Sequence, residues 1–446
     1  MKKICIVGTG YVGLVTGSCF ADMGNQVTCV DINEAKIAAL NEGVIPIYEP
    51  GLEQVVQRGI KSSALTFTTS IERGAAGSDF VFICVGTPTM EGSRPNLSYV
   101  YDAYMRVCPI LVKDSSTLVI KSTVPPGTAN VMRSMWDRTT PGQFIPIVSN
   151  PEFLREGHAV EDFMFPDRVV IGSADPQGSE SLAELYRPLK SPIFITDNST
   201  AEFIKYASNT FLATKVSFIN EMSVLCDKLG VDVTNVAKGI GMDPRIGKDY
   251  LRAGIGYGGS CLPKDIAALT YLARSHGCKP LLLDAVTQVN NRQPWHLVHH
   301  IEEALGGGFA GKTIGILGLA FKANTDDTRF SPSLEVIKAL RTREIKAIKC
   351  YDPKTSEIGE GLIEMCQTPY DAATGCDAVI VATDWPEFKE LDLNHLKAVM
   401  RGTVLADGRN MLDPTQVRQA GFTYIGVGRG SKDPIQAKKD VWALAS

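Results

Sequence analysis

Residues 2–24 read KKICIVGTGYVGLVTGSCFADMG, and this stretch decides the fold. A short apolar run leads into Gly8, Gly10 and Gly13, and a helical pattern follows directly. In a dinucleotide-binding fold the first glycine makes the turn, the second lets the backbone approach a pyrophosphate, and the third lets helix and strand pack closely. We therefore predict that a pyrophosphate rests on the N-terminus of this helix.

An acidic residue closes the next predicted strand. Asp31 ends the run VTCVD, 18 residues after Gly13. A carboxylate at this place accepts hydrogen bonds from both ribose hydroxyls and repels a 2′-phosphate. The pattern therefore favours NAD over NADP as the cofactor.

The chain has 446 residues, which at roughly 150 residues per domain suggests about three domains. Residues 1–197 alternate strands and helices as a parallel α/β domain does, and residues 307–446 return to that rhythm. Residues 198–306 show little strand character and hold one long helical pattern, from 200 to 229, which Gly230 would end. We predict the α/β class, with two doubly wound Rossmann-like domains joined by a long central helix.

The strands that we expect are named by their sequence. In the first domain they are KKICIVG, QVTCVD, DFVFICVGTP, TLVIKSTVP and IPIVSNPEF. In the third domain they are KTIGILGLAFK, AIKCYDP, DAVIVATDWPEF and GTVLADGRN, with a helix through SPSLEVIKALRT. Ligands are expected outside the carboxyl ends of these strands.

Composition excludes several classes of partner. The 45 basic and 49 acidic residues give a net charge of −4 without a block of one sign, so we expect neither nucleic acid nor an anionic membrane as partner. We identify no signal peptide and no apolar run of about 20 residues, which favours a cytoplasmic protein. The eleven cysteines form no CxxC pair, and His296, His299 and His300 lack further ligands, so we expect no metal.

The densest chemical signal is GIGYGGSCLPKD, residues 254–265. The glycines let the backbone wrap a ligand, and Pro263 then opens a helical run. Cys261 would thus lie at a helix start beside Lys264, where the helix dipole and a cation both lower the pKa of a thiol. We predict a reactive thiolate, although cysteine frequency alone would make Cys261 one more small buried residue.

Other polar residues lie where site groups gather. Lys205 and Asn209 are four residues apart on the central helix and share one face, where they could polarise a reacting oxygen or form a solvated stripe. Thr123, Glu152 and Glu156 follow predicted strands of the first domain, although carboxylates in loops are often only solvated. With no suitable histidine, acid and base chemistry falls to lysines and carboxylates.

At this point the chain resembles the family of UDP-glucose and GDP-mannose 6-dehydrogenases. The resemblance runs nearly end to end, through GTGYVGLV, IPIYEPGL, VGTPT, KSTVPPGT, SNPEFLREG, GMDPRIG, GYGGSCLPKD, LGLAFKANTDDTR and DGRN. The family resemblance implies an N-terminal NAD domain, a C-terminal domain for the nucleotide sugar, and a central helix that pairs two subunits in a homodimer.

The resemblance also implies site residues. NAD would be faced by Gly8, Gly10, Tyr11, Val12, Gly13, Asp31, Lys36, Thr87, Thr123, Glu156, Lys264 and Arg329. The UDP-sugar would be faced by Glu152, Phe153, Leu154, Arg155, Glu156, Lys205, Asn209, Tyr250, Leu251, Arg252, Ala253, Gly254, Gly258, Phe321, Lys322 and Arg409, and Arg245 would reach the neighbouring subunit's site. The catalytic set would be Cys261, Lys205, Asp265, Asn209, Thr123 and Glu152.

The expected reaction is a four-electron oxidation of a primary alcohol to a carboxylate with two NAD, through a thiohemiacetal and a thioester on Cys261. The run DPRIGKDYLRAGIGYGGSC is similar to the UDP-glucose branch, whereas Leu262 and Arg252 depart from its commonest pattern and leave GDP-mannose and UDP-N-acetylmannosamine as alternatives. Two farther rivals are a two-electron hydroxyacid dehydrogenase and a non-catalytic NAD-binding module.

Overall fold

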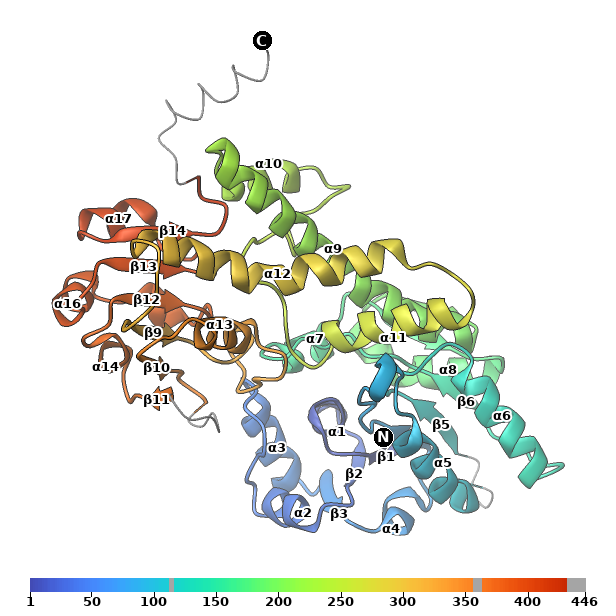
Figure 1. Ribbon diagram of the computed structural model, residues 1–446. Coiled ribbons are helices and arrows are strands. Elements are labelled where there is room, and N and C mark those ends of the chain that lie inside the picture. Colours follow the sequence, from blue (N-terminus) through green and yellow to red (C-terminus); the bar gives the residue numbers. More distant parts are fainter. Residues whose placement is uncertain (112–115, 356–362, 431–446) are drawn as a thin grey trace. The chain divides into compact units, whose positions relative to one another are not determined.

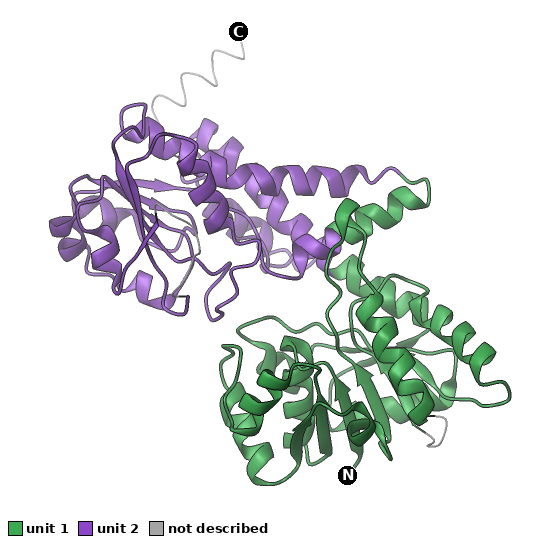
Figure 2. Ribbon diagram, turned by 60° about the horizontal axis from the view of Figure 1, so that its bottom comes forward, with its two compact units in different colours: residues 1–208, 267–278 green, residues 209–266, 279–446 purple. Residues whose placement is uncertain are grey.

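The structure is a computed structural model that describes residues 1–111, 116–355 and 363–430 (Figure 1). The chain divides into two compact units, shown in different colours in Figure 2. Unit 1 contains residues 1–208 and 267–278, and unit 2 contains residues 209–266 and the described residues from 279 onward.

Unit 1 is built on an eight-stranded sheet with the order β3-β2-β1-β4-β5-β6-β7-β8. All neighbouring strands are parallel except β6 and β7, which are antiparallel. The chain order reverses between β1 and β4, which is where open parallel sheets bind ligands. The strands are β1 (Lys3–Val7), β2 (Gln26–Val30), β3 (Leu65–Thr68), β4 (Phe80–Ile83), β5 (Thr117–Ile120), β6 (Ile147–Ser149), β7 (Val169–Gly172) and β8 (Ile193–Thr196).

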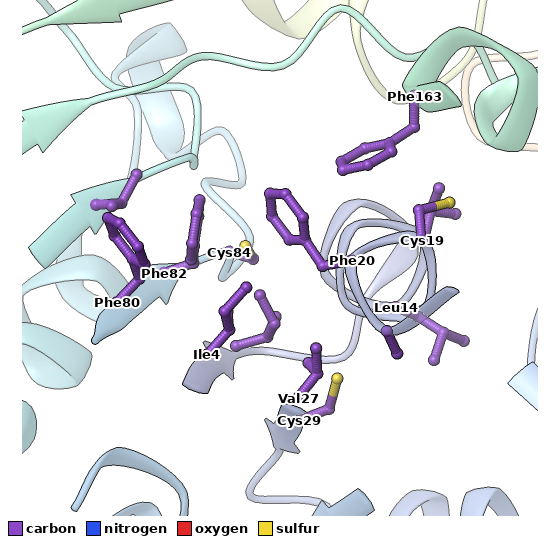
Figure 3. Close-up of a cluster of buried hydrophobic side chains, with 14 of the residues drawn as sticks. Ile4, Leu14, Cys19, Phe20, Val27, Cys29, Phe80, Phe82, Cys84 and Phe163 are labelled. Atoms are coloured by element: carbon purple, nitrogen blue, oxygen red, sulfur yellow. The ribbon is translucent and has the colours of Figure 1, made fainter. Parts of the chain in front are cut away.

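The helices of unit 1 bury both faces of this sheet. Along β4, Phe80 and Phe82 join one apolar cluster while Val81 and Ile83 join another, as the alternation of side chains along a strand requires. Figure 3 shows Phe20 pointing from its helix toward Phe82, and the centroids of these two rings are 5.4 Å apart. The helices are α1 (Tyr11–Asp22), α2 (Glu34–Asn41), α3 (Leu52–Lys61), α4 (Ile71–Ala75), α5 (Ser98–Leu111), α6 (Thr128–Thr139), α7 (Ala159–Met164) and α8 (Pro176–Tyr186).

Unit 2 contains a parallel six-stranded sheet with the order β11-β10-β9-β12-β13-β14. The strands are β9 (Thr313–Leu317), β10 (Ala347–Tyr351), β11 (Ile363–Met365), β12 (Ala378–Val381), β13 (Val404–Asp407) and β14 (Thr423–Gly426). The remaining helices are α9 (Asn198–Leu229), α10 (Val233–Gly241), α11 (Leu262–Ser275), α12 (Leu281–Ala304), α13 (Pro332–Arg341), α14 (Pro369–Ala373), α15 (Pro386–Lys389), α16 (Leu393–Val399) and α17 (Pro414–Gln419). The chain of α9 passes from unit 1 into unit 2, and that of α11 passes back.

The predicted fold class is confirmed. The long helix expected at 200–229 is α9, and Gly230 ends it with a left-handed φ of +67°. Strands β3, β7, β8, β11 and β14 were not expected. The division into domains 1–197, 198–306 and 307–446 stays a prediction, and residues 431–446 of the last range lie outside the described residues. Among the described residues, no helix has both the length and the apolar composition that crossing a membrane requires.

Candidate active site

Three glycines shape the loop between β1 and α1 in unit 1. Gly8 has a φ of +98°, and a Cβ on Gly13 would lie 1.9 Å from the carbonyl oxygen of Gly8. A Cβ on Gly10 would meet no heavy atom of the described residues within 4 Å. Gly10 is also the N-cap of α1, and no side chain in the described part of the chain caps the helix there. The first turn of α1 thus presents backbone N–H groups to open space, which fits the pyrophosphate of NAD.

Asp31 directly follows β2 at the same edge of the sheet. Its Oδ2 accepts hydrogen bonds from the N–H and the hydroxyl of Thr9, at 3.0 and 2.7 Å, and from Lys36 Nζ at 2.9 Å. The N–H of Asn33 donates to Oδ1 at 3.0 Å. Burial would raise the pKa of Asp31, but these hydrogen bonds outweigh burial and hold the pKa below its ordinary value. Asp31 is therefore ionised, as an acceptor for ribose hydroxyls has to be.

A buried ion pair connects the loop after β6 with α9. Lys205 Nζ lies 3.0 Å from Glu152 Oε1, and the two side chains are 4% and 5% exposed. The N–H of Leu154 donates to Glu152 Oε2 at 2.6 Å, and Lys205 Nζ lies 5.3 Å from the ring centroid of Phe153. Burial would raise the pKa of Glu152, whereas Lys205 and the N–H of Leu154 bring it below its ordinary value. The Glu152 carboxylate is anionic and holds the Lys205 ammonium in place.

The turn at Glu156 and Gly157 is fixed by side chains from two other segments. The N–H of Gly157 donates to the hydroxyl of Tyr11 at 2.9 Å and to Glu49 Oε2 at 2.6 Å. Glu49 Oε1 accepts a further hydrogen bond, 2.8 Å long, from the N–H of Ala159. Tyr11 and the buried Glu156, both expected at the NAD site, therefore belong to one connected part of unit 1.

The remaining residues expected in unit 1 lie on its other loops. Thr87, after β4, is buried, and Val12 is half-buried in the first turn of α1. Thr123, after β5, lines a small cavity. Arg155 pairs with Asp162 at 2.6 Å, and its side chain is 54% exposed. The structure thus gives Arg155 a carboxylate partner within its own loop.

A buried lysine that sequence reasoning missed lies near Glu152. Lys121, at the end of β5, donates from Nζ to Asn150 Oδ1 at 3.1 Å and to the hydroxyl of Tyr186 at 3.2 Å. Burial lowers the pKa of Lys121 to about 8, although Glu152 acts in the opposite direction. A positive charge that ends the apolar run TLVI was the sequence signal that could have identified it.

Cys261 of unit 2 stands at the N-cap of α11. Its carbonyl oxygen accepts the N–H of Asp265 at 2.9 Å, and its Sγ lies 3.6 Å from the hydroxyl oxygen of Ser260. Cys261 is partly exposed, whereas Cys226 and Cys350 are buried. Cys261 therefore directly precedes the first turn of a 14-residue helix, and its role as nucleophile stays a prediction.

Three other predicted site residues of unit 2 are joined by hydrogen bonds. Asp265 is 1% exposed, and its Oδ2 accepts a hydrogen bond from Asn209 Nδ2 at 2.6 Å. Lys264 Nζ donates to Asp265 Oδ1 at 2.5 Å. Its ammonium pairs with the Asp265 carboxylate, and the expected effect of Lys264 on the Cys261 thiol stays a prediction.

Amide side chains from two helices hold the glycine-rich loop that precedes Cys261. On α9, Asn220 accepts the N–H of Gly254 at 2.9 Å. On α12, Asn290 accepts the N–H of Tyr257 at 2.8 Å and donates to its carbonyl oxygen at 3.1 Å, and Gln293 donates to the carbonyl oxygen of Gly254 at 3.1 Å. These amides were missed because their partners lie far away in the sequence.

Close packing explains two glycines of this loop. A Cβ on Gly258 would lie 2.1 Å from the carbonyl oxygen of Phe330, and one on Gly254 would lie 2.8 Å from that of Gly408. Both glycines were expected to face the substrate, and each also lets the backbone approach another segment of unit 2. Of the other expected loop residues, Leu251 and Ala253 are buried, and Tyr250 has a left-handed φ of +62°.

Arg409 joins three segments of unit 2. Its guanidinium donates to the carbonyl oxygens of Ala382, Gly256 and Phe321 at 2.8, 3.0 and 2.9 Å. The ammonium of Lys322 lies 5.4 Å from the ring centroid of Phe321. Arg409 was expected to face the substrate, and the structure shows that it also fixes the glycine-rich loop.

Two other predicted arginines lie at the surface of the chain. Arg245 pairs with Asp243 at 2.6 Å, and its side chain is 88% exposed. Arg329 pairs with Asp327 at 2.8 Å, and its side chain is 63% exposed. Their expected roles toward a neighbouring subunit and toward NAD stay predictions.

Comparison with known proteins identifies the family. The chain matches the NAD binding, central and UDP binding domains of the UDP-glucose/GDP-mannose dehydrogenase family, over residues 2–190, 199–292 and 315–414. The chain belongs to this family. It is an NAD-dependent oxidoreductase, and the predicted cofactor is confirmed. Residues 315–414 are the part of the chain that matches the UDP binding domain of the family.

Individual members of the family cover nearly the whole chain. A UDP-glucose 6-dehydrogenase from Rhizobium meliloti is 45% identical over 436 residues, which are 96% of this chain and 99% of that relative. The structure of a UDP-glucose dehydrogenase from Pyrobaculum islandicum has a TM-score of 0.89 at 38% identity and covers 96% of this chain and 98% of that one. A UDP-D-ManNAc dehydrogenase from Pyrococcus horikoshii has a TM-score of 0.85 at 31% identity, with 96% and 100% covered.

Leu262 and Arg252, the residues that left the choice of sugar nucleotide open in the sequence analysis, both have contacts within unit 2. Leu262 packs against the buried cluster of Ala213, Ile266 and Val286, so its identity affects apolar packing at the start of α11. Arg252 pairs with Asp384 at 2.9 Å.

Proposed function

We propose that the protein oxidises UDP-glucose to UDP-glucuronate in two successive NAD-dependent steps. Cys261 at the N-cap of α11 carries this proposal, because a nucleophile is needed only when oxidation continues beyond the aldehyde. Relatives named UDP-glucose 6-dehydrogenase, such as those of Rhizobium meliloti and Rickettsia typhi at 45% and 40% identity, support the choice of sugar nucleotide.

The first step converts the C6 alcohol to an aldehyde. The glycine loop and Asp31 would hold NAD, which when bound would accept the hydride. As the hydride leaves C6, the hydroxyl proton passes to Asp265, and the Lys205 ammonium stabilises the developing oxyanion. The ion pair with Glu152 fixes the direction of Lys205 during this transfer.

The second step needs a new C–H bond that can lose a hydride. The thiolate of Cys261 attacks the aldehyde carbon, a C–S bond forms, and the oxygen takes a proton to give a thiohemiacetal. Loss of its C6 hydride to a second NAD and of its hydroxyl proton to Asp265 would leave a thioester on Cys261. Water activated by Glu152 or Asp265 then attacks, the C–S bond breaks, and the carboxylate and the free thiolate are released. Lys205 and Asn209 would hold the tetrahedral oxyanions.

The decisive experiment counts NADH for each UDP-glucose consumed and identifies the product by mass. The proposal predicts two NADH and UDP-glucuronate. One NADH with an aldehyde product would contradict the thioester route, and no NADH would indicate a binding module. GDP-mannose and UDP-N-acetylmannosamine serve as parallel substrates, and faster turnover of either would reassign the sugar nucleotide.

We also propose that the chain forms a homodimer through α9. Phe211, Phe218 and Leu225 recur at intervals of seven residues on this helix and are 65%, 47% and 51% exposed. An apolar stripe with this period supports pairing with another helix. Light scattering should give twice the chain mass of 48.3 kDa, and the double variant F218E/L225E should give the monomer. A wild-type monomer would contradict the proposal.

A further inference from the structure

Glu202 is a buried carboxylate that the reaction described above does not use. It lies on α9 three residues before Lys205 and is 3% exposed. Its Oε2 accepts the N–H of Gly127 at 2.7 Å, and its Oε1 accepts the N–H of Ala129 at 3.0 Å and the hydroxyl of Ser149 at 2.9 Å. A buried carboxylate needs such donors, so these three contacts define its position.

Two of the three groups that donate to Glu202, the N–H groups of Gly127 and Ala129, lie at the start of α6. The N-cap of this helix is Gly127, which has a left-handed φ of +93° and no side chain to cap the helix. Glu202 caps the helix from α9, because its two carboxyl oxygens accept the N–H groups of Gly127 and Ala129 at the start of the helix. Because only residues 121–127 separate β5 from α6, the contact also limits the movement of Thr123.

The third contact reaches the end of β6. Ser149 is the last residue of that strand, three residues before Glu152. Its hydroxyl donates to Glu202 and accepts a hydrogen bond from Asn198 Nδ2 at 3.1 Å. One carboxylate on α9 therefore holds the segments that carry Thr123 and Glu152, and its own helix carries Lys205.

These segments meet at a small cavity of about 10 Å³. Thr123, Ser149, Glu202 and Lys205 are among its lining residues, all of them in unit 1. A cavity of this volume has room for about one water molecule. The side chains around it are therefore closely packed, and none of them can move far.

We propose that Glu202 is a positioning residue for the oxidation, because it fixes the Thr123 loop and the end of β6 against α9 and thereby sets the mutual arrangement of Thr123, Glu152 and Lys205. The inference rests on the proposed function, since catalysis is its readout. Displacement of a catalytic group by about 1 Å can reduce the rate about 100-fold.

The test compares two variants of the full-length enzyme with wild type. In Glu202→Gln the size is kept, but an NH₂ group replaces one acceptor oxygen and faces an N–H or hydroxyl donor. We expect kcat with UDP-glucose to fall about 10- to 100-fold while KM for NAD changes less than about threefold. Glu202→Asp keeps both acceptor oxygens on a shorter chain, and its kcat should lie between those of Glu202→Gln and wild type.

The matched control is Asp377→Asn in unit 2. Asp377 is a buried carboxylate before β12 that accepts the N–H of Thr313 at 2.8 Å and pairs with Arg401. This variant should lower Tm and leave kcat within about twofold of wild type, because a loss of stability alone does not slow the folded enzyme. The control thus separates a positioning effect from general destabilisation.

Each outcome decides the proposal. A Glu202→Gln enzyme with wild-type kcat, or an equal loss of kcat in Asp377→Asn, would overturn it. If Glu202→Gln does not fold, Glu202→Asp decides, and an unchanged kcat overturns the proposal. Wild type that is inactive on UDP-glucose refutes the proposed substrate instead, and the same comparison is then made with GDP-mannose or UDP-N-acetylmannosamine. If wild type oxidises none of the three, both proposals fail.

Discussion

The sheets of the two units begin in the same way. Gly8 follows β1 and Gly318 follows β9, and both have a φ of +98°. Each glycine donates its N–H to the last carbonyl oxygen of the second strand, that of Val30 or Tyr351, at 2.7 Å. Both sheets also place their first strand between the second and fourth in chain order. The same turn therefore starts two domains that bind different groups.

An aspartate follows the second strand of each sheet, and the two aspartates differ in their exposure to solvent. Asp31 accepts the N–H of Thr9 and is partly exposed. Asp352 accepts the N–H of Leu319 at 2.7 Å, and it is buried beneath the indole N–H of Trp385 at 3.2 Å. The predicted contact with ribose therefore suits the accessible Asp31 and not the buried Asp352.

The helices that follow show the larger difference. In unit 1, α1 begins at Tyr11, three residues after Gly8, and its N-cap is a glycine. In unit 2, α13 begins at Pro332, and Ser331 caps it by accepting the N–H of Ser333 at 3.2 Å. The first domain leaves its helix N-terminus without a side-chain cap, as the predicted phosphate site requires, whereas Ser331 caps the helix of the second domain.

The largest expected effect separates chemistry from cofactor binding. Cys261→Ala should lower the rate of UDP-glucuronate formation at least about 1,000-fold, because the thioester can no longer form. NAD affinity, measured by titration calorimetry, should stay unchanged, since the glycine loop of unit 1 is intact. Wild-type turnover by this variant would refute the covalent step.

A smaller loss is expected at the buried ion pair of unit 1. Lys205→Met removes an oxyanion donor, so kcat should fall about 100- to 1,000-fold. The unpaired Glu152 should also lower the free energy of unfolding by about 3–5 kcal/mol, as urea denaturation would show. Lys36→Met is the control, because Lys36 pairs with Asp31 at a more exposed position and its loss should cost less than about 1 kcal/mol. Equal losses from both variants would contradict the buried role of Lys205.

Alanine at two glycines tests the comparison of the sheets directly. Gly10→Ala should leave Tm unchanged, because Gly10 has a φ of −70° and open space, yet weaken NAD binding about tenfold, or about 1.4 kcal/mol. Gly318→Ala should lower Tm and leave NAD binding unchanged. Its φ is left-handed and its Cβ would lie 2.3 Å from that of Thr383, so we expect a loss of at least about 1–2 kcal/mol. If Gly318→Ala weakened NAD binding as much, the assignment of the cofactor to unit 1 would fail.

The smallest effect is a dependence of stability on pH. Burial raises the pKa of Glu202 to about 7, and hydrogen bonds from Ala129 and Ser149 act in the opposite direction. The folded state therefore holds this proton more tightly, so the contribution of Glu202 to stability is complete below about pH 4.5 and is lost as the pH rises through 7. The Tm of wild type should fall relative to that of Glu202→Gln between pH 5 and pH 8, values chosen to span this titration. A Tm difference that stays constant would contradict the raised pKa.

Glu152 provides the opposite sign within the same unit. Its pKa is lowered, so its contribution to stability is present above the ordinary carboxyl pKa and is lost in acid. Between pH 5 and pH 8, values chosen to span the Glu202 titration, Glu152 stays ionised, so the expected change in Tm comes from Glu202 and not from Glu152.

Much of the fold could be predicted because short stretches of the sequence show the hydrophobic pattern of the element they form. Buried strands such as β4 read as continuous apolar runs, and the long helical pattern that Gly230 ends gave α9. One missed strand, β7 (Val169–Gly172), reads VVIG and is buried throughout, so its apolar run could have been recognised. Two others lack a buried apolar run: the residues of β8 (Ile193–Thr196) are about half-exposed or half-buried, and β11 (Ile363–Met365) has only three residues.

The candidate site was predictable only where its residues adjoin in sequence. The family motifs contain Lys205, Asn209 and Asp265, but nothing in the sequence indicated that Asn209 would hydrogen-bond Asp265 across 56 positions. Glu202 was missed for the same reason, since its partners come from other strands and helices, whereas the positive charge after TLVI could have indicated Lys121. The assigned catalytic and binding roles remain predictions.

The three hydrogen bonds of Arg409 constrain how this enzyme can evolve a new substrate range. They attach the glycine-rich loop to the segments after β9 and β12 through carbonyl oxygens, which every residue type provides. Side chains on those segments are therefore open to substitution without loss of the attachment. The arginine itself is not, because lysine lacks the planar array of donors that reaches three separated acceptors. We therefore expect relatives with other substrates to differ in the side chains of these segments and to keep the arginine.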